Sequence, residues 1–103
     1  MTTAILIPTD GRPKRVTLPE LDSLRVLQQS VGGYIDCVRA DDFVGYVNDE
    51  GLLVGLEENI TASILFQRYL VGNVVVVGAY SSEGVYDGDN HDAPEWLLAL
   101  FGV

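Results

Sequence analysis

Four consecutive valines, Val74–Val77, constrain the fold of this chain more than any other feature of its sequence. They lie in the most apolar segment, YLVGNVVVVGAY, and lack the apolar–polar alternation of a strand with one solvated face. A strand of this kind is usually central in its sheet or covered on both faces. We therefore expect a sheet to form around Val74–Val77. Gly and Asn interrupt the segment, which is too short to span a bilayer.

Two antiparallel strand pairs are predicted from the earlier part of the chain. The segments TAILIPTDG and PKRVTL predict an N-terminal hairpin, because Pro, Asp and Gly supply turn chemistry between β-rich runs. The segments YIDCV and FVGYV, separated by polar RADD, predict a second pair. Asn48–Gly51 then predicts a turn in which Gly51 takes a positive φ, and Leu52–Leu56 predicts a returning strand. Gly51 is therefore expected to resist substitution.

Three helices are predicted near residues 18–31, 60–69 and 93–101. Thr17 and Glu20 have capping-box spacing, and Asp92 and Glu95 have the same spacing before the last helix. Asn59 is expected to cap the middle helix. Gly32 and Gly33 are expected to end the first one. Spacings of three and four predict these buried faces: Leu21, Leu24, Leu27 and Val31; Ile60, Ile64, Leu65 and Tyr69; Trp96, Leu97, Leu100 and Phe101.

The fold class that follows is α+β, with one domain over residues 1–103. We expect a mainly antiparallel sheet with these three helices packed to one side of it. The apolar content of 48% is typical of a globular chain, and this length supports a core without metal or disulfides. Cys37 cannot form an internal disulfide and is expected in the core. No basic segment precedes the short apolar run near the N-terminus, so we expect a cytoplasmic protein rather than a secreted one.

The net charge of −9 belongs to the second half of the chain. Residues 1–40 carry five cations against four carboxylates, whereas residues 41–103 carry only Arg68 against eleven carboxylates. Such a field repels phosphates, which argues against direct nucleic-acid binding and favours a basic partner or simple solubility. The candidate interaction surface comprises Asp41, Asp42, Asp49, Glu50, Glu57, Glu58, Asp87, Asp89 and Asp92.

The segment DGDNHD matches a calcium-loop pattern only in part. Asp87, Asp89 and His91 fall at its first, third and fifth positions, but Asp92 stands where the sharp turn needs Gly. Leu98 stands where the closing bidentate carboxylate should be. We therefore expect no metal site, and an acidic loop leading into a helix cap.

The sequence also gives little evidence for a catalytic site. His91 is the only histidine, so a Ser-His or Cys-His mechanism would have to pair it with Ser81, Ser82 or Cys37. None of these lies at a strained strand-to-helix turn. Adjacent carboxylates on turns usually point apart, and VGNVVVVG has its glycines around a strand rather than before a helix. We expect no enzymatic activity and no cofactor.

The stretch YVNDEGLLVGLEEN, followed by a small-residue helix and VGNVVVVG, resembles the domain-of-unknown-function family 3846. The resemblance rests on the Asn or Asp and the Glu before Gly51, on Gly55-Leu56, on Asn59 and on Gly72-Asn73. The opening ILIPTDGRPKRVTL is also similar to the family's. Members are small proteins found largely in phages, plasmids and bacterial hosts. The resemblance implies an accessory protein of mobile DNA and no particular activity.

Two classes of function follow from these observations. The first is an interaction protein that modulates a host protein through its acidic surface or an exposed strand edge, with DNA mimicry as a sharper version. The second is a small-ligand binder, such as a nucleotide-sequestering module. Its anion contacts would be Arg12, Lys14, Arg15, Arg25 and Arg39. A symmetric homodimer through a strand edge or the C-terminal helix is our expectation for the oligomeric state.

Overall fold

The structure, a computed structural model, describes residues 1–80 and 90–103. Its single five-stranded sheet is antiparallel throughout and has the order β2-β1-β5-β4-β3. The α+β fold is therefore confirmed. The strands are β1 (Thr2–Ile7), β2 (Lys14–Leu18), β3 (Ile35–Arg39), β4 (Phe43–Asn48) and β5 (Val74–Gly78), and the helices are α1 (Ser23–Val31), α2 (Ile60–Phe66) and α3 (Glu95–Phe101).

The valine strand β5 is the middle of the sheet, as predicted. It pairs with β1 on one side and β4 on the other, and all five of its residues are buried. Val74 and Val76 pack in a core with Phe66 of α2 and Leu97 of α3, whereas the alternate valines pack in a second core with Leu27 of α1. Both faces of the central strand are thus dry.

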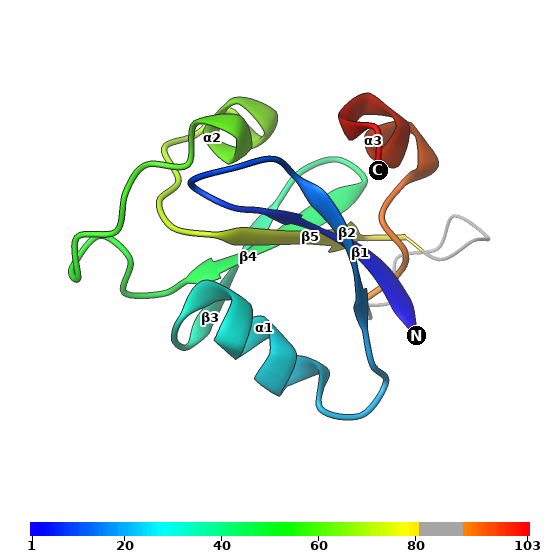
Figure 1. The fold of residues 1–103 in the computed structure, drawn as a ribbon, viewed down its shortest axis with the longest axis horizontal. Coiled ribbons are helices and arrows are strands. Elements are labelled where there is room, and N and C mark those ends of the chain that lie inside the picture. The colour runs from blue at the N-terminus through cyan, green and yellow to red at the C-terminus, as the bar shows by residue number, and fades with distance from the viewer. Residues whose placement is uncertain (81–89) are drawn as a thin grey trace.

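The helices lie on both faces of the sheet, and the prediction that they pack to one side is wrong. Figure 1 shows α2 and α3 above the sheet and α1 below it. The physical reason is contained in β5 itself, because successive strand residues point to opposite faces. A run without alternation therefore carries apolar side chains on both faces, and each face needs its own covering layer.

Helix α1 begins later than predicted. Thr17 lies in β2, where it pairs with Thr3, and the helix starts only after Asp22, which has φ 64° and makes no side-chain cap hydrogen bond. Consequently Leu21 is 84% exposed. Leu24 is also exposed, while Leu27 and Val31 are buried as predicted. Pairing with β1 overrides the capping-box spacing, and Gly32 ends the helix with φ 79°, as predicted.

Helix α2 has the predicted cap and a different buried face. The Asn59 side chain accepts the Ala62 N–H at 3.0 Å. Ala62 and Phe66 are buried, whereas Ile60, Ile64 and Tyr69 are exposed. Both sets have helical spacing, and the small Ala62 side chain lets the helix approach the sheet. The helix ends at Phe66, before Gln67 with φ 57°.

Helix α3 begins at Glu95 with Pro94 at its N-cap. The predicted cap is wrong, because the Asp92 carboxylate accepts the backbone N–H of Thr3 at 2.8 Å instead. Leu97 and Leu98 are buried, Phe101 is half-buried, and Trp96 and Leu100 are exposed. The helix therefore docks through a narrower face than predicted.

Two further predictions failed at single residues. Cys37 is exposed, because β3 is an edge strand in which only Val38 is fully buried, and Val38 points to the opposite face of the sheet from Cys37. Gly51 does not adopt a positive φ. What constrains Gly51 is space, since an added Cβ would lie 2.7 Å from a methyl carbon of Val71. The returning strand predicted over Leu52–Leu56 is a series of turns.

Candidate functional site

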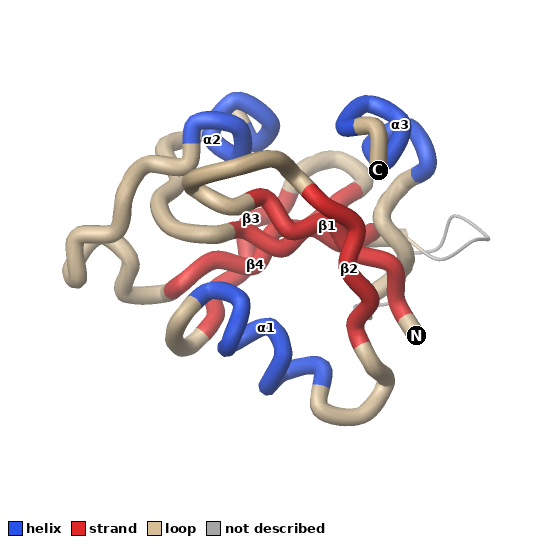
Figure 2. The backbone as a smooth tube through the Cα atoms, in the orientation of Figure 1, coloured by secondary structure: helices blue, strands red, loops and turns tan. Residues whose placement is uncertain are grey.

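Residues 49–58, which we call the β4–α2 loop, extend away from the rest of the fold. Figure 2 shows this segment as the long tan excursion between β4 and α2. Leu52, Leu53 and Val54 at its tip have exposed fractions of 72%, 86% and 60%. Three consecutive aliphatic side chains are thus exposed to solvent. Single exposed apolar residues are ordinary on a protein surface, but a contiguous group is not.

Hydrogen bonds hold this loop in one conformation. The Asn48 side chain accepts the Glu50 N–H at 2.8 Å, and the Glu50 carbonyl accepts the Val54 N–H at 3.0 Å. The Leu56 N–H then donates to the Gly51 carbonyl at 2.9 Å, which closes the tip. The Gly72 N–H donates to Glu57 at 2.8 Å and ties the returning arm to the body. The apolar tip is therefore presented on an organised support.

The base of the loop is acidic. Asp49 and Glu50 on one arm and Glu57 and Glu58 on the other are all exposed. The sequence has no Lys or Arg between Arg39 and Arg68, so no cation within the segment neutralises them. The β4–α2 loop thus combines an apolar tip with two carboxylate pairs at its base.

The other predicted acidic residues lie elsewhere. Asp41 and Asp42 form the β3–β4 turn at the opposite end of β4 from Asp49. A six-residue strand spans about 20 Å, so the turn and the loop base are separate acidic groups. Asp92 lies beside β1, held by Thr3, and Asp87 and Asp89 lie outside the described residues.

The predicted anion contacts do not converge on one cavity. Arg15 lines a cavity of about 790 Å³, and Arg39, on the far edge of the sheet, lines a different one of about 320 Å³. Arg12, Lys14 and Arg25 do not line the larger cavity. Arg15 also donates to the Val103 carbonyl at 3.0 Å. The nucleotide-type arrangement of several cations around one pocket is therefore not formed by these residues.

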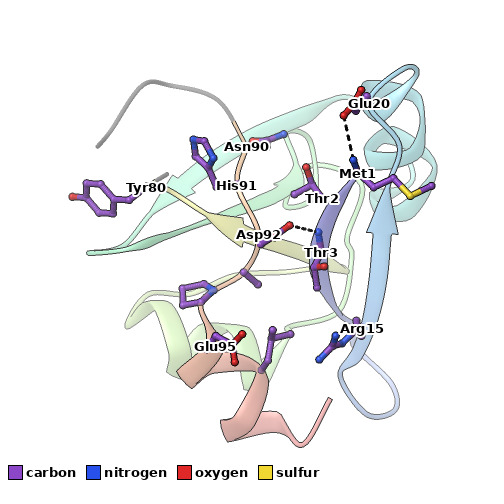
Figure 3. Close-up of a pocket in the computed structure, with 13 residues that line it drawn as sticks. Met1, Thr2, Thr3, Arg15, Glu20, Tyr80, Asn90, His91, Asp92 and Glu95 are labelled. Carbon is purple, nitrogen blue, oxygen red and sulfur yellow. Dashed lines mark hydrogen bonds and ion pairs between the residues drawn. The ribbon is translucent and has the colours of Figure 1, made fainter. Parts of the chain in front are cut away.

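The larger cavity is shown in Figure 3, between β1 and the segment that leads into α3. Glu20, Asp92 and Glu95 line it together with Arg15 and the Met1 ammonium, which pairs with Glu20 at 3.4 Å, so three carboxylates face two cations among the described residues. His91 lines the same cavity and is held by backbone pairing with Gly78 at 2.8 and 3.1 Å. An anionic ligand would thus meet more carboxylates than cations among the described residues that line this cavity.

Neither a metal cluster nor a membrane span is found in the described part of the chain. Within residues 1–80 and 90–103, no group of three His, Cys, Asp or Glu side chains is placed to hold a metal ion. No helix there is long and apolar enough to cross a membrane. Cys37 and His91, the two nucleophile or base candidates within these ranges, lie at the β3 edge and beside β5.

Sequence reasoning identified the carboxylates of the β4–α2 loop and missed its apolar tip. The strand predicted over Leu52–Leu56 would bury alternate side chains on one of its faces. The available signal was the glycine on each side, Gly51 and Gly55, of which Gly55 has φ 74°. Glycines bounding a three-residue run favour a looped segment over a strand.

Comparison with known protein families gives a match over most of the chain. A family model with the description "Domain of unknown function (DUF3846)" matches residues 1–95. No curated protein and no solved structure matches the chain.

Proposed function

The chain belongs to the DUF3846 family, a domain family of unknown function, and we propose that it is a non-enzymatic interaction protein that binds and modulates a host protein. In this proposal it is an accessory protein of a phage or another mobile element and acts in the bacterial cytoplasm. The observation that carries the proposal is the β4–α2 loop. Its exposed Leu52, Leu53 and Val54 are the contact residues.

The apolar tip supplies the binding energy. Full burial of one aliphatic side chain contributes about 1.5–3 kcal/mol, and these three are each more than half exposed in the free protein. Because the loop is already hydrogen-bonded, little conformational entropy is lost when a partner covers it. An ordered loop with an apolar tip thus suits insertion into a concave apolar site on another protein.

The carboxylates at the base of the loop favour a partner with basic residues around its apolar site. Asp49, Glu50, Glu57 and Glu58 would meet Lys or Arg around the partner's apolar site. Exposed charges of this kind accelerate encounter and discriminate between partners more than they add affinity. Binding should therefore weaken as salt rises, mainly through a lower association rate.

The proposal is tested by affinity capture from the bacterial host with matched variants. The wild type should retain one stoichiometric partner, and the double variant Leu52→Ser/Leu53→Ser should lose it. Ile64→Ser is the control, because Ile64 is equally exposed at 73% but lies on α2. Both variants should unfold within about 0.5 kcal/mol of the wild type, since all three side chains are on the surface. A partner retained by the double variant, or no stoichiometric partner at all, contradicts the proposal.

The two other functions receive less support. For nucleotide sequestration, the large cavity offers Arg15 and the Met1 ammonium, which is paired with Glu20, against the carboxylates of Glu20, Asp92 and Glu95; a thermal shift with nucleotides would support this function. For DNA mimicry, carboxylates must follow one continuous face. The β3–β4 turn and the loop base are instead at opposite ends of β4. We do not extend the proposal to either function.

A further inference from the structure

We propose a second contact site on this protein, a groove that takes an arginine side chain of a partner peptide against the indole of Trp96. This inference is independent of the β4–α2 loop. The groove is the cavity of about 320 Å³ between the end of α2, the start of α3 and the β3–β4 turn. The residues that line it include Asp41, Asp42, Gln67 and Trp96.

Trp96 is half in solvent yet firmly placed. Its side chain is 49% exposed. The indole N–H donates to the Asp42 carboxylate at 2.8 Å, and the ring packs edge-to-face on Phe43 with centroids 5.8 Å apart. Phe43 in turn packs edge-to-face on Phe66 at 5.1 Å. The indole is therefore a pre-positioned aromatic surface rather than a mobile side chain.

The turn that carries the carboxylates is equally well fixed. The Ala40 N–H donates to the Phe43 carbonyl at 2.9 Å, which closes a tight turn with Asp41 and Asp42 at its centre. The Asp42 carbonyl accepts the Ala79 N–H at 3.1 Å and ties the turn to the end of β5. Within the described residues, the exposed Asp41 carboxylate makes no hydrogen bond or ion pair. It is thus positioned to accept one from a ligand.

These groups together fit a guanidinium ion. An aromatic face attracts a cation, Trp most strongly, and the planar guanidinium also stacks on it. A carboxylate beside the ring accepts the guanidinium N–H groups in charge-assisted hydrogen bonds, which a neutral donor forms more weakly and an anionic side chain does not form. The cavity is at the small end of ligand pockets, which suits one side chain rather than a nucleotide.

Arg39 lines the same groove, so the protein carries a cation of its own there. Arg39 therefore places a like charge beside an incoming arginine. Removing the Arg39 charge should therefore strengthen peptide binding, which is the opposite of what an anion site would show. Tighter binding after removal of the Arg39 charge would indicate a cationic ligand, and weaker binding would indicate an anionic one.

The test uses Trp96 as its own reporter, since it is the only tryptophan in the chain. The full-length protein is titrated with the dipeptide acetyl-Arg-Arg-amide and with its citrulline twin, which has the same shape and no charge. The arginine peptide should change the indole emission saturably and the citrulline peptide should not. Raising salt from 0.05 to 0.5 M should weaken the response.

Variants locate the site. Asp41→Asn should weaken binding about fivefold, the scale of one exposed ion pair. Asp49→Asn, which changes the net charge equally at the far end of β4, should leave the affinity unchanged. Arg39→Ala should tighten it. An equal response to citrulline, or equal effects of Asp41→Asn and Asp49→Asn, would overturn the proposal, and neither outcome would bear on the β4–α2 loop.

Discussion

Asn59 connects the β4–α2 loop to the core. We predict that replacing it lowers the free energy of unfolding more than replacing any other residue that makes such a connection. Its side chain is 1% exposed and makes three hydrogen bonds. The Oδ1 atom accepts the Ala62 N–H at 3.0 Å, and the Nδ2 group donates to the carbonyls of Ile7 at 2.8 Å and Gly72 at 2.9 Å. One amide thus starts α2, holds β1 and anchors the returning arm of the β4–α2 loop.

The loss expected for Asn59→Ala follows from these bonds. Removal of an N-cap acceptor costs about 1 kcal/mol. Each buried carbonyl left without its donor costs about 1–3 kcal/mol. For one cap and two carbonyls the sum is about 3–7 kcal/mol, a large part of the 5–15 kcal/mol that holds a typical domain. With a mid-range urea dependence of about 2 kcal/mol per molar, the unfolding midpoint should fall by about 1.5–3.5 M.

Urea unfolding followed by Trp96 fluorescence and far-UV circular dichroism measures this loss. Asn73→Ala is the matched control, because Asn73 also bridges two backbone groups, Thr9 N–H and Ser30 carbonyl, but is only half-buried. Water can replace its bonds, so its loss should stay near 1 kcal/mol. Asn59→Ser should restore the N-cap hydrogen bond but not the two hydrogen bonds to the carbonyls of Ile7 and Gly72. The reasoning is refuted if Asn59→Ala costs no more than Asn73→Ala.

Three further predictions concern the sheet. The Cys37 thiol should react with a thiol reagent in the folded protein almost as fast as in urea, because it is exposed; slow native reaction would indicate burial. Gly45→Ala should lower the free energy of unfolding by about 2 kcal/mol, since its Cβ would lie 2.6 Å from the Phe66 ring; an unchanged urea midpoint would mean that the ring moves freely. Asp36→Ala should increase self-association in sedimentation experiments, because the Asp36 carboxylate accepts the Cys37 N–H at 2.8 Å on the edge strand β3; a variant that sediments like the wild type would show that this bond does not protect the edge.

The strands were predictable because their signals are local. Val74–Val77 and the two hairpins each combine an apolar pattern with adjacent turn residues, and all were found as predicted. The Asn59 cap was predictable for the same reason. The other two caps failed because spacing does not reveal competing partners. Thr17 pairs with β1, and the Asp92 carboxylate bonds Thr3 from the other end of the chain.

Helix faces were harder to predict because periodicity leaves a choice. Ile60 and Ile64 are four residues apart, and so are Ala62 and Phe66, so both pairs define a stripe on α2. Side-chain size favours the isoleucines, yet the helix buries the second pair. Phe66 reaches the space above Gly45, where a Cβ would clash with its ring. A contact between α2 and a strand glycine has no signature in either segment alone.

The β4–α2 loop shows how topology decides the candidate site. A strand returning from the Asn48 turn would have to pair beside β4, but β3 and β5 already occupy both edges of β4. Residues 52–56 therefore have no open edge to join, and their side chains stay outside. Because Leu52, Leu53 and Val54 remain in solvent, the stability of this fold does not require them to be apolar. The partner contact that we propose would account for their apolar character.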